Sequence, residues 1–215
     1  MILNRVVHIV DSDAGNRRSL ARTLRHEGMD SFAYASGDDL LEASGYILPG
    51  CVLIIARPPQ PDQSDMVRTL LAARAEMAVI VMGAEPTIAL AVQALRAGAV
   101  DFLDLACPLA KLRVALDYAF DILPEKVAHQ RFIGEAIALK SRLTPREQDV
   151  LKGIVAGHTN RAIAQALGIG TRTVEMHRSN IMQKLHMDNI AELIRFAVLS
   201  GIADPGATDP GANAA

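Results

Sequence analysis

Short apolar segments alternate with amphipathic segments along the first half of the chain. Three uninterrupted apolar runs are typical of strands buried on both faces of a parallel sheet, and they occupy residues 6–10, 51–56 and 78–82. Helical spacing of apolar positions predicts helices near 16–27, 38–43, 65–75, 87–97 and 109–123, and weaker strands are expected near 32–34 and 100–103. Five strand-helix repeats predict an α/β doubly wound fold, in which the functional site lies at the carboxyl ends of the strands.

The second half changes to a purely helical pattern of four short amphipathic segments. Thr144 and Glu147 are three residues apart and predict a capping box at the start of the first segment. The two middle segments are separated by the tight turn at 168–170, which predicts a helix-turn-helix. Thr171 is expected to cap the second helix of that motif.

The second helix of the motif has one apolar stripe and one polar face. Val174, Ile181 and Leu185 recur at helical spacing and form the expected buried stripe. A solvent-facing helix with arginine and small polar side chains is the element that enters a DNA major groove. The outward residues are Arg172, Met176, Ser179 and Gln183, with Glu175 and Asn180 on the flanks.

Charge separates the two halves of the chain. Residues 140–200 hold nine Lys and Arg against five acidic residues, a net charge of +4. Residues 1–121 hold eleven Lys and Arg against fifteen acidic residues, a net charge of −4. Only the second half suits a polyanion, which favours DNA binding over a helical fragment that merely packs against another element.

One pattern of residues extends through the second half of the chain. It consists of Leu143-Thr144-Pro145-Arg146-Glu147, Val150-Leu151, Gly157, Asn160-Arg161, Ile163-Ala164, Leu167, Thr173-Val174-Glu175, His177-Arg178 and Lys184-Leu185. In this pattern the second half resembles the LuxR/FixJ (NarL-type) family of bacterial transcription regulators, specifically its FixJ-like branch. The resemblance implies base contacts by Glu175, Met176 and Ser179, and backbone contacts by Asn160, Arg161, Arg178 and Lys184. Thr171, Arg172 and Thr173 complete the expected DNA-binding set.

The first half resembles response-regulator receiver domains over about residues 5–121, with the strand order 2-1-3-4-5. The motifs are residues 7–11, 49–52, Arg57 with Pro59, and 96–103. Receivers of this family hold Mg²⁺ with an acidic pair, accept phosphate on an aspartate, and use a Thr or Ser and a Lys. The resemblance places Ile55 at the acceptor position, and it leaves Asp11 in place with Asp13 as a possible stand-in for its lost partner. The other positions are changed to Ser12, Met82 and Leu105.

An isoleucine can neither attack phosphorus nor coordinate a hard cation, because both tasks need an oxygen atom. We therefore expect a degenerate receiver that works without phosphorylation. Ile55, Met82 and Leu105 are expected to pack together, each contributing about 1.5–3 kcal/mol if fully buried. This apolar plug would replace the phosphorylation switch and fix one arrangement; the alternative is neutral loss of an unused site.

A receiver of this kind can still be an assembly surface. The resemblance implies homodimers through residues 87–97, 100–103 and 109–123, with Leu95 on the expected interface. Phe102 matches the aromatic residue that responds to phosphorylation in ordinary receivers, and it is either locked here or simply a core aromatic.

The expected domains are residues 1–121, a partly helical linker at 122–141, the helix-turn-helix domain at 142–201 and a disordered tail at 202–215. Apolar runs fall short of the roughly 20 residues needed to span a bilayer, and Cys51 and Cys107 are expected to be free thiols, so a cytoplasmic protein is predicted. The sequence predicts no enzyme, metal or cofactor, since it lacks phosphate-binding glycine motifs, a nucleophile elbow and paired histidine ligands.

Three functions remain open at this point. The first is a transcription regulator that binds promoter DNA as a dimer without phosphorylation. The second is a regulator whose receiver senses a small molecule or a protein partner. The third is an antagonist that captures a genuine response regulator or its kinase, with DNA binding secondary.

Overall fold

The computed structural model describes residues 5–59 and 62–203, which fall into two compact units. The first unit extends to Gln130 and the second begins at Arg131. Each unit has its own apolar core. Within the described residues, no helix is long and apolar enough to cross a bilayer.

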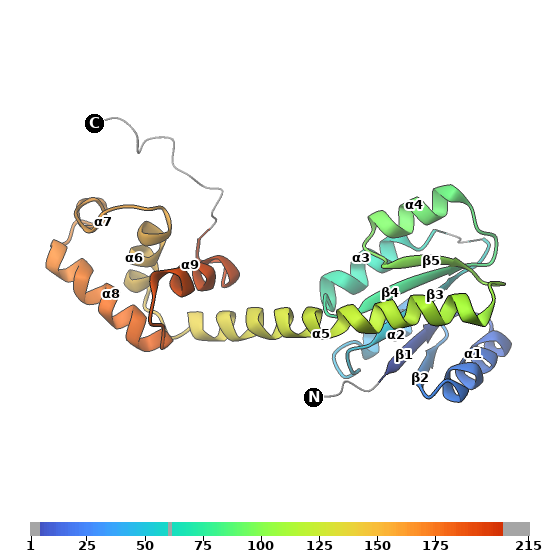
Figure 1. Cartoon of the computed structure of the whole chain (residues 1–215). Helices are drawn as coiled ribbons and strands as arrows, with labels where there is room; N and C mark the ends of the chain where they lie inside the picture. The colour runs from blue at the N-terminus through green and yellow to red at the C-terminus, as the bar shows by residue number, and fades with distance from the viewer. Residues whose placement is uncertain (1–4, 60–61, 204–215) are drawn as a thin grey trace. The chain divides into compact units, whose positions relative to one another are not determined.

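The first unit is built on a parallel sheet of five strands in the order β2-β1-β3-β4-β5 (Figure 1). The central strands β1 and β3 and their neighbour β4 are buried along their whole length, as their apolar runs predict. This observation confirms the doubly wound fold and the strand order. The strands are β1 (Val6–Val10), β2 (Asp30–Tyr34), β3 (Cys51–Ala56), β4 (Ala78–Gly83) and β5 (Asp101–Asp104).

Helices cover both faces of this sheet (Figure 1). Alternate strand residues point to opposite faces, so Ile9 and Leu53 join one core while Val10 and Ile54 join the other. Helices α1 (Ala14–His26) and α5 (Leu109–Lys140) pack on the first face. Helices α2 (Gly37–Ala43), α3 (Ser64–Ala73) and α4 (Ile88–Arg96) pack on the second.

Helix α5 is longer than the sequence suggested, because residues 122–141, expected to form a partly helical linker, continue it as far as Lys140. Proline disfavours a helix interior, yet Pro124 lies within α5. Leu123 and Val127, on either side of Pro124, both pack against the core of the first unit and favour continuation of the helix. Ala136, near its end, packs in the core of the second unit.

The described residues of the second unit contain four further short helices, and α6, α7 and α9 have side-chain caps at their N-terminal ends. Thr144 and Glu147 form the expected capping box, and Gly168 ends α7 with a left-handed φ of 64°. Thr159 caps α7 and Asn189 caps α9 through their side chains. The helices are α6 (Pro145–Val155), α7 (Asn160–Leu167), α8 (Thr171–Leu185) and α9 (Ile190–Leu199).

Two details of the sequence interpretation are wrong. Thr171 is the first residue of α8, and the cap position is Gly170, which has no side chain to offer a hydrogen bond. The tail does not begin at residue 202, because the Ile202 side chain is buried in the core of the second unit. The rest of the expected tail, residues 204–215, lies outside the described residues.

Candidate nucleic-acid interface and the carboxyl edge of the sheet

The outward face of α8 is the candidate nucleic-acid interface. Val174, Ile181 and Leu185 are buried in the core of the second unit, where α8 packs against α6 and α7, and the exposed residues of α8 lie on its other face. Met176 is 52% exposed although its side chain is apolar. Exposure of a large apolar side chain among polar neighbours suits contact with a thymine methyl group. The other exposed residues of this face are Thr171, Arg172, Glu175, Ser179 and Gln183, while Thr173 is partly buried.

The turn between α7 and α8 is tied to α6. Arg146 donates a hydrogen bond of 2.5 Å from Nη2 to the carbonyl oxygen of Leu167 at the end of α7. The last carbonyl groups of a helix have no partner within the helix, so this contact satisfies one of them. It also fixes the position of the turn from which α8 begins.

Two of the predicted backbone-contacting residues lie together. Arg178 on α8 donates a hydrogen bond of 3.1 Å from Nη1 to Oδ1 of Asn160, the first residue of α7. The Arg178 side chain is therefore oriented before any ligand arrives, which lowers the entropy cost of a phosphate contact. Arg161, the next residue of α7, is exposed.

Lys184 has a second role that the sequence did not suggest. Its Nζ lies 2.8 Å from Oε1 and 2.7 Å from Oε2 of Glu147, whose side chain is only 3% exposed. Burial raises the pKa of Glu147, but the hydrogen bonds from Lys184 and Thr144 outweigh that effect and leave the pKa below its ordinary value. The pair joins the start of α6 to the last turn of α8. The capping-box pattern identified Glu147, but no local signal pairs it with a residue so distant in the sequence.

The three apolar residues at the carboxyl edge of the sheet share one core. Ile55 near the end of β3 and Met82 near the end of β4 are paired in register and buried. Leu105, just after β5, is partly buried and packs against the same core. Ser12, at the position expected for a second acid, is exposed. The three predicted residues of the plug, Ile55, Met82 and Leu105, therefore belong to one core.

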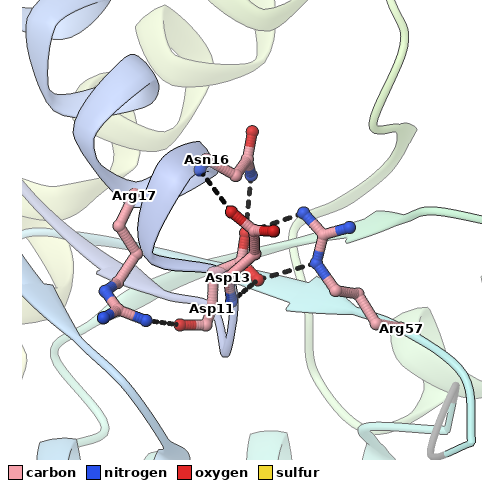
Figure 2. Close-up of polar contacts among 5 residues, drawn as sticks. All are labelled: Asp11, Asp13, Asn16, Arg17 and Arg57. Atoms are coloured by element: carbon pink, nitrogen blue, oxygen red, sulfur yellow. Dashed lines mark hydrogen bonds and ion pairs between the residues drawn. The ribbon is translucent and has the colours of Figure 1, made fainter.

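Asp11, the remaining acid, accepts hydrogen bonds from several neighbouring residues (Figure 2). Arg57 donates to both carboxylate oxygens, with distances of 2.7 Å from Nε to Oδ1 and 3.0 Å from Nη2 to Oδ2. Asn16 Nδ2 and the backbone N–H of Asp13 donate to the same carboxylate. The backbone carbonyl of Asp11 accepts a hydrogen bond from Arg17.

These contacts keep Asp11 ionised although its side chain is fully buried. Burial raises the pKa of Asp11, but the hydrogen bonds from Arg57, Asp13 and Asn16 outweigh that effect and lower the pKa. The sequence patterns did not identify Arg57 and Asn16 as partners of Asp11. A signal was present, because β1 and β3 are adjacent in the predicted strand order and residues that follow them meet at one edge.

The residues at this edge do not fit the magnesium ion that receivers hold. Mg²⁺ needs several oxygen ligands in octahedral geometry, and here one buried carboxylate has both oxygens engaged by a guanidinium group. Asp13, the possible stand-in, instead caps α1 by accepting from the backbone N–H of Asn16. Among the described residues, no group of three or more His, Cys, Asp or Glu side chains could hold a metal ion.

A cavity of about 330 Å³ lies beside the Asp11–Arg57 pair. Its walls come from the ends of β1 and β3 and from the segment between β2 and α2. The lining is mixed, with the charged pair, two serines and the side chains of Ile54, Ile55, Pro58 and Pro59.

The residues expected at a dimer interface differ in exposure. Leu95 is exposed on α4, together with Ile88 and Val92. Phe102 on β5 is partly buried and packs against the core beneath α4. Its ring fills the space beside Gly83, where an added Cβ would lie 2.9 Å from Cζ of Phe102. The core interpretation of Phe102 fits this packing.

Comparison with known proteins identifies relatives of both units. Residues 7–117 match the family model described as the response regulator receiver domain, and residues 141–197 match that of bacterial regulatory proteins of the luxR family.

Similarity extends over nearly the whole chain. The chain is 36% identical to the transcriptional regulatory protein FixJ of Azorhizobium caulinodans, covering 92% of this chain and 93% of that protein. It is 31% identical to the tetrathionate response regulatory protein TtrR of Salmonella typhimurium, covering 88% of this chain and 90% of that protein. Full-length FixJ from B. japonicum has a similar structure, with a TM-score of 0.53, 28% identity and coverage of 93% of this chain and 98% of that one.

Proposed function

This chain belongs to the FixJ-like response regulators of the LuxR family, and from that premise we propose that it regulates transcription without aspartate phosphorylation, as a DNA-bound homodimer. The family consists of transcriptional regulators of two-component systems, which have a DNA-binding domain. In the proposed organisation, residues 1–121 are a pseudo-receiver and residues 142–201 bind DNA. We place the protein in the cytoplasm, where its DNA target lies.

The observation that carries the proposal is the burial of Ile55, which the resemblance places at the acceptor position, in the same core as Met82 and Leu105. A hydrocarbon offers no nucleophile to phosphorus. The guanidinium group of Arg57 also supplies a positive charge to the Asp11 carboxylate, with Nε 2.7 Å from Oδ1. Because the guanidinium group of Arg57 is part of the chain, it cannot dissociate as a metal ion can. The charge at this edge of the sheet therefore stays the same.

DNA binding is assigned to the N-terminal half and outward face of α8. Glu175, Met176 and Ser179 face base edges, while Asn160 and Arg178 contact the phosphate backbone as a hydrogen-bonded pair. Arg161, Thr171, Arg172, Thr173 and Lys184 complete the proposed interface.

Dimerisation is assigned to the surface of α4, β5 and the first part of α5. Exposed apolar side chains on α4 and α5 support this assignment, since a patch of such residues marks an association surface. They are Ile88, Val92 and Leu95 on α4, and Leu109, Val114 and Tyr118 on α5.

The test uses the unmodified full-length protein. Genome-wide capture of DNA fragments identifies its sites, and binding to a selected site is then measured with and without acetyl phosphate and Mg²⁺. We expect sequence-selective binding whose affinity does not change with acetyl phosphate, and no phosphoryl group in the intact mass. An Arg178→Ala variant is the control that binding occurs through α8. Selective binding that requires acetyl phosphate would contradict the proposal.

One observation favours a second candidate, in which the pseudo-receiver also senses a small molecule or a protein partner. The cavity beside Asp11 and Arg57 is within the lower range of ligand-sized pockets, at about 330 Å³. Under this candidate, selective DNA binding by the purified protein requires an added cellular fraction. Binding by the purified protein alone favours the first candidate.

A further inference from the structure

A second cavity of about 130 Å³ lies in the first unit, on the sheet face that α2 covers. It is bounded by strands β1 and β2 and by the segment between α2 and β3. The lining residues are His8, Phe32, Tyr34, Tyr46, Ile47 and Leu48. Neither the phosphorylation positions nor the DNA-binding residues belong to it.

Aromatic rings form most of this cavity. The His8 ring is fully buried and stacks on Phe32, with ring centroids 5.8 Å apart and an angle of 21° between the planes. Tyr34 lies on the other side of His8, with centroids 6.0 Å apart. Flat aromatic walls favour a flat aromatic ligand, because offset stacking and edge contacts add to the burial of apolar surface.

The segment that closes the cavity is held in place. The carbonyl oxygen of Leu48 lies 3.0 Å from Nε2 of His8, and the carbonyl oxygen of Ile47 accepts a hydrogen bond of 3.0 Å from Nη2 of Arg74. Arg74 is itself paired with Glu76. The cavity is therefore formed before a ligand arrives, as small-molecule sites usually are.

His8 supplies one polar group to the cavity. Because a carbonyl oxygen can only accept, Nε2 carries the hydrogen in the contact with Leu48 and Nδ1 of the neutral ring is left as an acceptor. Burial lowers the pKa of His8 and so favours the neutral ring. The hydroxyl group of Tyr34 is 3.5 Å from Nδ1, the long limit of a hydrogen bond. Because the His8 side chain has no exposed surface, a ligand donor reaches this nitrogen by displacing the Tyr34 hydroxyl group.

The mouth of the cavity is apolar and open to solvent. Tyr46 is 94% exposed, Leu48 is 58% exposed and Phe32 is 52% exposed. Large apolar side chains that gather at the surface mark a binding site more often than single exposed ones. Water and small solutes can therefore reach the rings of Phe32 and Tyr46 directly.

We propose that this cavity binds a small molecule with a single aromatic ring and one hydrogen-bond donor. The volume limits the ligand to one ring, since an apolar cavity of about 150 Å³ accepts benzene and this one is about 130 Å³. The ligand needs a hydrogen-bond donor because Nδ1 of His8 is an acceptor. The ligand lies against the Tyr34 side chain. The backbone carbonyl oxygen of Tyr34 accepts a hydrogen bond of 3.2 Å from the backbone N–H of Asp11. The proposal does not depend on how the second unit binds DNA.

The test exploits the small number of tyrosines. The chain has three, and two of them, Tyr34 and Tyr46, line the cavity, whereas Tyr118 lies elsewhere on α5. Full-length protein labelled with 3-fluorotyrosine is titrated with phenol and followed by ¹⁹F NMR. The Tyr34 and Tyr46 signals are expected to shift saturably, with a Kd on the order of 1 mM or tighter, while the Tyr118 signal stays fixed. Signals are assigned with Tyr46→Ala and Tyr118→Ala, both at exposed positions.

Two comparisons make the outcome specific. Anisole has the same ring but no donor, and it should bind about 3- to 10-fold more weakly than phenol. Tyr46→Ala should weaken phenol binding, whereas Ile137→Ala, at another exposed apolar position outside every proposed binding surface, should not. The proposal is overturned if the Tyr34 signal does not respond to phenol, if all three tyrosine signals move in parallel, or if anisole binds as tightly as phenol.

Discussion

Replacing Lys184 with methionine should destabilise the second unit. Weaker DNA binding is expected only as a consequence of that loss of stability. The change removes the ammonium group that contacts both oxygens of Glu147 and leaves a carboxylate that is 3% exposed without its ion pair. Breaking a fully buried pair costs about 3–5 kcal/mol. Lys184 is 38% exposed, so water screens this pair and we expect a loss of about 2 kcal/mol. For a unit of this size, that loss lowers Tm by about 8–16 °C.

The assay is hydrogen exchange of the full-length protein read by mass spectrometry, which reports the opening free energy of each segment. Peptides from α6 and α8 should exchange faster in Lys184→Met, and peptides from the sheet should not change. Losing the ammonium group raises the pKa of Glu147 above its wild-type value, so protonation at low pH relieves the penalty. The difference between variant and wild type should therefore be smaller at about pH 5 than at pH 7.5.

A second variant separates this role from a phosphate contact. Glu147→Gln combined with Lys184→Met leaves no buried charge, and we expect the double variant to be more stable than Lys184→Met alone. If Lys184 affects DNA binding only by stabilising the fold, the double variant regains the wild-type dependence of the binding constant on salt concentration. If the slope of log K against log salt concentration is smaller by about one unit in the stable double variant, Lys184 contacts a phosphate group directly. Unchanged stability of Lys184→Met would refute the reasoning.

Three other variants test the remaining assignments. Met176→Ala should alter preference at one or two base pairs by about 1–3 kcal/mol, measured on a panel of operator variants; equal losses on specific and random DNA would exclude a base contact. Leu95→Arg places a charge on the exposed apolar surface of α4 and should raise the dimer dissociation constant at least tenfold in sedimentation experiments, and an unchanged dimer would move the interface elsewhere. Arg57→Leu leaves the buried Asp11 carboxylate without its guanidinium partner, so hydrogen exchange in β1 and β3 should accelerate at pH 7. The acceleration should be smaller at pH 4, because protonation of Asp11 removes the cost of burying an unpaired charge. Equal exchange in the variant and the wild type at pH 7 would show that the pair does not stabilise the sheet.

Local patterns were sufficient for the elements of both units. The apolar run at residues 51–56 matches β3, and the stripe of Val174, Ile181 and Leu185 is buried as predicted. These predictions hold because periodicity and capping depend on residues within a few positions of one another. Local patterns gave the wrong result where tertiary packing opposed them. Pro124 does not end α5, and the Ile202 side chain lies in the core of the second unit.

The sequence by itself predicted that Ile55 occupies the acceptor position, and it determined that α8 turns polar residues outward and that positive charge belongs to the second half. Tertiary structure alone decided which distant charges meet. Arg57 is 46 residues from Asp11 and Lys184 is 37 residues from Glu147, yet each pair lies within hydrogen-bonding distance. A buried carboxylate requires a partner, but its identity depends on which chain segments the packed strands and helices place side by side.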